Sequence, residues 1–164
     1  MAAEERSLSI AQWRELAQNG TVLPMRIPLD GDSMRPLIRR GRDPVTIVPL
    51  QRPLKKGDVV LFTLGDGRFV VHRVWRLRDG LVRTLGDHCQ NPEPWFPQGQ
   101  VLGQVIRFQR GGRAHRLDTP LARALGRGWM AALPLRRGLW RLRALAGRCY
   151  RRLIPRKGGD KHGG

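Results

Sequence analysis

The sequence is poor in cysteine and contains no long apolar run. Its two cysteines, Cys89 and Cys149, are too few for a disulfide framework, so a reducing compartment is expected. No run approaches the roughly 18 apolar residues of a membrane-spanning helix. Residues 1–20 carry charges instead of an apolar stretch, so no signal peptide is expected either. These absences favour a protein that is cytoplasmic or attached peripherally to a membrane.

Acidic residues are also scarce. The chain has 31 Lys and Arg against 13 Asp and Glu, which gives a formal net charge of +18. Residues 119–159 contain no acidic residue at all. Such a chain should attract an anionic partner, whether nucleic acid, phospholipid headgroups or an acidic peptide.

The order of the patterns predicts a mainly β protein. An amphipathic helix is expected over 9–19, followed by short β-rich runs separated by Gly, Pro and Asp turns. The expected strands cover 45–50, 58–63, 68–77, 81–85 and 101–108, and 22–29 reads as an extended edge segment. Strands at this spacing favour an antiparallel, meandering β domain. The predicted divisions are a helix in 1–21, a β domain in 22–118, a basic helical segment in 119–157 and a disordered tail in 158–164.

The basic segment 119–157 has an apolar stripe at three- and four-residue steps. Its members are Leu135, Leu139, Leu142, Ala146, Cys149 and Leu153. Glycines and a proline should divide the segment into two short helices. The stripe either packs on the β domain or faces an anionic membrane, while its arginines could alternatively bind nucleic acid.

Three short stretches carry the residues of chemical interest. Ser33 follows Gly31, and Pro36 is placed for the first turn of a short helix that Gly41 would end. The serine is either a plain helix cap or an exposed hydroxyl near a helix N-terminus. His72 lies in a β-rich run, where a core histidine is the commoner explanation. Asp87 and Glu93 lie in a proline-rich loop, where acids are usually solvated.

Taken together, these stretches resemble a peptidase family. Gly-x-Ser-Met-x-Pro at 31–36 is followed by Lys-Gly-Asp-Val-Val at 56–60, Val-Val-His-Arg-Val at 70–74, Gly-Asp at 86–87 and Gly103. In this order they resemble the serine peptidases related to type I signal peptidases and LexA. A histidine in place of the bacterial lysine is similar to the archaeal, endoplasmic-reticulum and sporulation-type signal peptidases.

The resemblance implies a LexA/signal-peptidase-like antiparallel β fold with specific site residues. Ser33 matches the nucleophile and His72 the general base, with His88 and His115 as weaker rivals for that role. Asp87 and Glu93 match two acidic positions that support the histidine, and Asp87 is slightly favoured as its partner. The family's membrane-anchoring helix has no counterpart here.

We therefore expect a serine endopeptidase that cleaves a precursor or leader peptide through an acyl-enzyme. A serine needs a neighbouring base, and histidine with a carboxylate supplies one. No metal or organic cofactor is expected, because the cysteines and histidines lack the spacing of a ligand set. The alternative is a nucleic-acid-binding or regulatory protein with a LexA-like domain and a basic arm. The residues before the β region are too few for a helix-turn-helix domain, so nucleic acid is not the expected partner.

Overall fold

The computed structural model describes residues 10, 12, 13, 15 and 24–139. The chain divides into two units, Met1–Met130 and Ala131–Gly164. The division therefore falls later than the expected end of the β domain at residue 118. Most of the predicted helix 9–19, the stripe from Leu142 onward and the predicted tail 158–164 lie outside the described residues.

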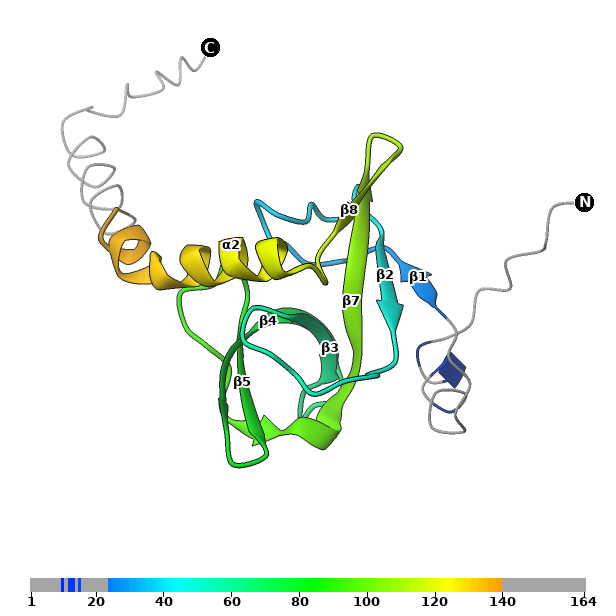
Figure 1. The fold of residues 1–164 in the computed structure, drawn as a ribbon, viewed down its shortest axis with the longest axis horizontal. Coiled ribbons are helices and arrows are strands. Elements are labelled where there is room, and N and C mark those ends of the chain that lie inside the picture. The colour runs from blue at the N-terminus through cyan, green and yellow to red at the C-terminus, as the bar shows by residue number, and fades with distance from the viewer. Residues whose placement is uncertain (1–9, 11, 14, 16–23, 140–164) are drawn as a thin grey trace, which may run out of the picture. The chain divides into compact units, whose positions relative to one another are not determined.

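The first unit is built on one antiparallel sheet, which confirms the mainly β prediction (Figure 1). Its strands are β1 (Met25–Ile27), β2 (Val45–Val48), β3 (Val59–Thr63), β4 (Phe69–Arg78), β5 (Leu81–Leu85), β6 (Phe96–Pro97), β7 (Val101–Arg110) and β8 (Arg113–Arg116). They are ordered β1-β2-β7-β3-β4-β5-β6, and β8 pairs with β7. The long β7 pairs with β3 at its start and with β2 further along, so the sheet curls on itself.

The curl buries both faces of the central strands. In β3, Val59 and Leu61 join one apolar cluster while Val60 and Phe62 join a second. These residues alternate in sequence, and side chains of a strand alternate between its faces. A continuous apolar run in β3 therefore reflects burial on two sides.

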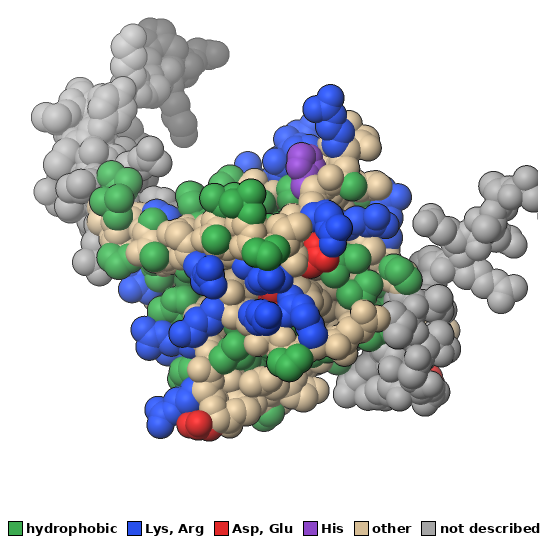
Figure 2. Space-filling model, in the orientation of Figure 1, with side chains coloured by type: hydrophobic (Ala, Val, Ile, Leu, Met, Phe, Trp, Pro, Cys, Tyr) green, Lys and Arg blue, Asp and Glu red, His purple; other side chains and the backbone are tan. Residues whose placement is uncertain are grey.

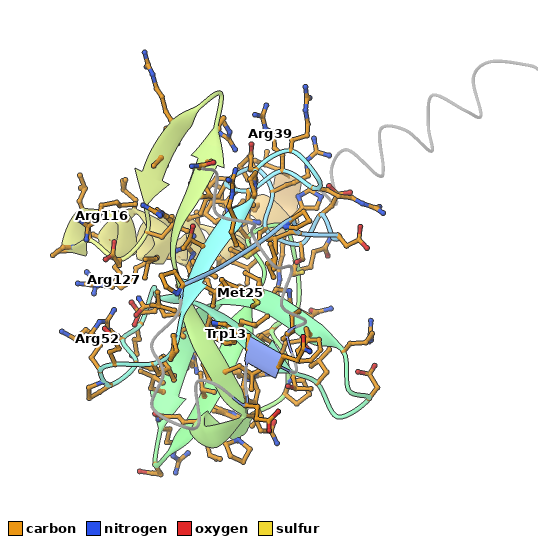
Figure 3. All side chains as sticks on the ribbon, turned by 90° about the vertical axis from the view of Figure 1, so that its right-hand side faces the viewer. Trp13, Met25, Arg39, Arg52, Arg116 and Arg127 are labelled. Atoms are coloured by element: carbon orange, nitrogen blue, oxygen red, sulfur yellow. The ribbon has the colours of Figure 1, made fainter. Side chains whose placement is uncertain are left out.

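The N-terminal segment contributes a tryptophan to the first cluster. Ile10, Gln12, Trp13 and Glu15 are helical, and Trp13 is buried in the cluster that also contains Met25 (Figure 3). A Cβ at Gly103 would lie 2.7 Å from the Trp13 ring atom Cη2. Gly103 is therefore needed because the indole packs directly on the β7 backbone.

The basic segment begins with helix α2 (Pro120–Ala131). Its start is capped by Thr119, whose hydroxyl accepts a hydrogen bond from the Ala122 N–H at 3.1 Å. The helix runs through Gly126 without interruption, and a second helical stretch covers 133–139. Among the described residues, no helix has the length and apolar character needed to cross a membrane.

The segment after Ser33 differs from the prediction. We expected a short helix there, but residues 33–37 form consecutive turns. The N–H groups of its second half are used elsewhere: Gly41 donates to the Leu29 carbonyl, and Arg39 donates to the Asp43 carboxylate. Two isolated bonds have helical spacing, from Ile38 N–H to Met34 O at 2.9 Å and from Asp43 N–H to Arg39 O at 3.2 Å, and they do not join into a helix. A helix N-terminus therefore does not act on Ser33.

Candidate active site

Ser33 is half-buried at the first of these turns. The turn after β5 holds its backbone. Its carbonyl accepts a 2.7 Å hydrogen bond from the His88 N–H. His88 belongs to the turn after β5, which is closed by the bond from Cys89 N–H to Gly86 O at 2.9 Å. The turn 86–89 therefore fixes the backbone that carries the serine.

His72 lies in the middle of β4, opposite Val60 of β3. The side chain is buried, with a relative exposure of 5% for the residue, and its ring lies 5.9 Å from that of Phe62. Burial penalises the charged imidazolium and lowers the pKa of His72 from 6.5 to about 4. The imidazole is therefore neutral, as a base must be before it accepts a proton.

Gly86 brings Ser33 and His72 together. A Cβ at residue 86 would lie 2.7 Å from the Ser33 carbonyl oxygen and 3.0 Å from His72 Nε2. It would also lie 2.6 Å from the Cys89 Sγ. The serine backbone, the imidazole nitrogen and the thiol thus surround one Cα, and only glycine leaves room for all three.

The two candidate acids have different surroundings. The Glu93 carboxylate lies 3.5 Å from His72 Nδ1, and the Glu93 backbone is held at both ends, by Thr84 O and by Arg83 Nε. Among the described residues, no group makes a hydrogen bond of normal geometry to Nδ1. A small movement would therefore let the Glu93 carboxylate accept a hydrogen bond from Nδ1–H. The imidazole would then carry its proton on Nδ1 and leave Nε2 unprotonated.

Asp87 instead pairs with Arg73. Its two carboxylate oxygens accept bonds of 2.9 and 2.8 Å from Arg73 Nε and Nη2, and both side chains are buried. Arg73 also donates to Gly57 O at 2.9 Å. The sequence slightly favoured Asp87 because Glu93 has a longer side chain whose register the sequence leaves open. The different contacts of the two acids lead us to assign that role to Glu93 below.

The Arg73–Asp87 pair also ties α2 to the site. Trp129 Nε1 donates to the Asp87 carbonyl at 2.8 Å. A Cβ at Gly126 would lie 2.3 Å from Arg73 Nη1, so the helix rests directly on the guanidinium. This close packing explains why α2 contains a glycine that the sequence suggested would break it.

A cavity of about 560 Å³ contains the candidate residues Ser33, His72 and Glu93. The remaining wall is largely apolar, with Ile27, Leu29, Leu61, Val70 and Val71 among its members. Cys89 also lines it, a position that sequence reasoning did not single out because nothing in the sequence links a lone cysteine to the other motifs. Within the described part of the chain, no three His, Cys, Asp or Glu side chains are close enough to hold a metal ion.

The rival histidines lie elsewhere. His88 is exposed and does not line the cavity of Ser33, although its backbone N–H binds the Ser33 carbonyl. His115 stacks on Phe108 with 4.9 Å between ring centroids and lines a different cavity. His72 is therefore the histidine that shares a cavity with Ser33.

In comparisons with known proteins, no protein-family model matches the chain and no curated protein matches it significantly.

Proposed function

We propose that the protein is a serine endopeptidase with Ser33 as nucleophile, His72 as general base and Glu93 as the orienting acid. The observation that carries the proposal is the shared cavity, which collects three residues from distant parts of the sequence in complementary roles. The motif order resembling signal peptidases supports the same assignment.

The proposed reaction uses the neutral imidazole. His72 Nε2 takes the Ser33 hydroxyl proton as Oγ attacks the carbonyl carbon of the scissile bond. The carbon–nitrogen bond then breaks, and the imidazolium returns the proton to the leaving amine. Water, activated by the same nitrogen, releases the acyl group. Glu93 accepts the Nδ1–H bond and stabilises the transient imidazolium.

The apolar wall of the cavity supports a peptide substrate with apolar side chains beside the cleaved bond. Leu29 and Val70 line the same cavity as Ser33 and His72, so a peptide bound there would lie close to both residues. A precursor or a leader peptide fits this description. We further propose that the enzyme acts while attached peripherally to a membrane.

Labelling with a phosphonylating serine probe tests the assignment. The wild type should be labelled at Ser33, as shown by peptide mapping, whereas Ser33→Ala should not react. His72→Gln should label far more slowly because the hydroxyl has lost its base. His115→Gln is the matched control and should label like the wild type.

Cys89 requires a separate variant because its thiol lines the same cavity. Cys89→Ala should keep both labelling and peptide cleavage. Activity that survives in Ser33→Ala but disappears in Cys89→Ala would make the thiol the nucleophile and would overturn the serine mechanism.

A further inference from the structure

Helix α2 carries an apolar face that the described part of the chain leaves open. Leu121 is 70% exposed, Leu125 68% and Trp129 37%. Steps of four residues put all three on one side of the helix. Figure 2 shows apolar side chains following α2, with Lys and Arg side chains beside them. Single exposed apolar residues are ordinary, but a continuous row of large ones marks an interaction site.

A cavity widens this apolar face. It has a volume of about 540 Å³, and its apolar lining includes Leu125, Trp129, Leu37, Phe108 and Leu117. Charged side chains line it as well, namely Arg73, Asp87, Arg110 and Arg116. All of these residues belong to the unit Met1–Met130. The exposed Leu125 therefore borders an open hollow with apolar and charged walls instead of a closely packed wall.

Exposed arginines lie on α2 and on the strand before it. Arg127 is exposed on α2, and Arg113 and Arg116 are exposed on the neighbouring part of the chain before the helix. Figure 3 shows Arg116 and Arg127 on the same side of the molecule. Arg116 is partly neutralised by Asp118 at 2.8 Å, but neither α2 nor the sequence from there to residue 159 contains an acid.

We propose that the face formed by Leu121, Leu125 and Trp129, with Arg116 lining the cavity that this face borders, docks on an anionic phospholipid bilayer. A bilayer surface offers an apolar interior for the leucines and negative headgroups for the arginines, which is the environment of an interfacial amphipathic helix. A nucleic acid offers the negative charge but leaves the leucines in water, so it fits the face less well. The inference is independent of the peptidase chemistry.

The test is co-sedimentation of the full chain with vesicles made of an equal mixture of phosphatidylcholine and phosphatidylglycerol. The wild type should pellet with these vesicles and not with pure phosphatidylcholine, and binding should weaken as salt screens the arginines. The double variant Leu121→Gln/Leu125→Gln should bind at least about tenfold more weakly, because two large apolar side chains no longer enter the bilayer. Arg116→Gln should weaken binding by about fivefold.

The matched control is Leu81→Gln/Trp95→Gln, which removes two exposed apolar residues outside α2. This control should bind like the wild type, as should Ser33→Ala, which has no proposed role at the membrane. Equal binding by the leucine double variant and the wild type overturns the proposal.

Three other results overturn it as well. A clear fall in the thermal midpoint of the leucine double variant would mean that the two leucines are packed in the full chain. Equal binding to vesicles without phosphatidylglycerol would remove the anionic requirement. Binding to duplex DNA with a steep salt dependence, without binding to vesicles, would assign the basic surface to nucleic acid.

Discussion

The buried imidazole of His72 should make the stability of the protein fall on mild acidification. Its pKa is about 4 in the folded protein and about 6.5 in an unfolded chain. Between these values the unfolded chain binds a proton at this residue and the folded protein does not. The free energy of unfolding therefore decreases as the pH falls through this window, and the contribution is complete at neutral pH.

The size of the effect follows from the difference between the two pKa values. Linkage gives a loss of about 2 kcal/mol by about pH 5 and about 3 kcal/mol below about pH 4. Urea unfolding of the wild type and of His72→Gln at a series of pH values measures it as the change in their stability difference. His115→Gln removes an exposed histidine and serves as the control for a general effect of losing one histidine.

Two results would refute the reasoning. Parallel stability curves for the wild type and His72→Gln would mean that the imidazole is not desolvated. If the wild type instead becomes more stable relative to His72→Gln on acidification, Glu93, 3.5 Å away, holds the imidazolium strongly enough to reverse the effect of burial. A titration of the histidine ring protons by NMR would locate the same pKa directly.

The same pKa predicts that the acidic limb of kcat/KM lies clearly below pH 6.5, measured as cleavage rate against pH. Glu93→Gln should lower kcat at least about tenfold while changing stability by less than about 0.5 kcal/mol. Asp87→Asn should instead cost about 3 to 5 kcal/mol in urea unfolding because it leaves a buried arginine unpaired; equal effects of these two substitutions on stability would contradict the division of roles. Gly86→Ala should abolish cleavage and cost about 1 to 3 kcal/mol, whereas Gly99→Ala, with open space around it, should do neither.

The sequence predicted the strands well where a strand is long and buried. Residues 81–85 form β5 as expected, and the expected strands 58–63 and 101–108 correspond to β3 and β7. It missed β8, whose residues Arg113–Arg116 are all exposed. A polar strand has no apolar pattern to reveal it, although the Gly111-Gly112 turn, with positive φ at both residues, is a hairpin signal.

Site residues could be named from the sequence, but their mutual contacts could not. The motif order pointed to Ser33 and His72, which line one cavity. The same order left Asp87 and Glu93 as alternatives, because both follow β5 in one loop. The two acids are distinguished by the guanidinium of Arg73, which binds Asp87. Arg73 follows His72 directly in β4, so the two side chains point to opposite sides of the strand.

The β-rich run around His72 suggested a core position, but it could not identify the groups that surround the imidazole. A histidine can act as a base without a dry site because its ordinary pKa is about 6.5, so the proposed role alone does not predict a lowered pKa. The structure places Val60 opposite His72 and the Phe62 ring 5.9 Å away. Only the pairing of β3 with β4 brings these side chains onto the imidazole, and strand pairing is a property of the folded chain.

The Arg73–Asp87 pair links the two proposals in one rigid part of the molecule. Asp87 stands between Gly86, which packs on Ser33 and His72, and the His88 N–H that binds Ser33. Its backbone carbonyl accepts the bond from Trp129 of α2, and its carboxylate holds the arginine on which the helix rests. Breaking a buried pair of this kind costs about 3 to 5 kcal/mol, so we expect α2 and the turn that positions the serine to move together. If α2 lies on a bilayer, the cavity of Ser33 is then held at a fixed orientation to that surface, which would restrict cleavage to peptide bonds presented at a defined height above the membrane.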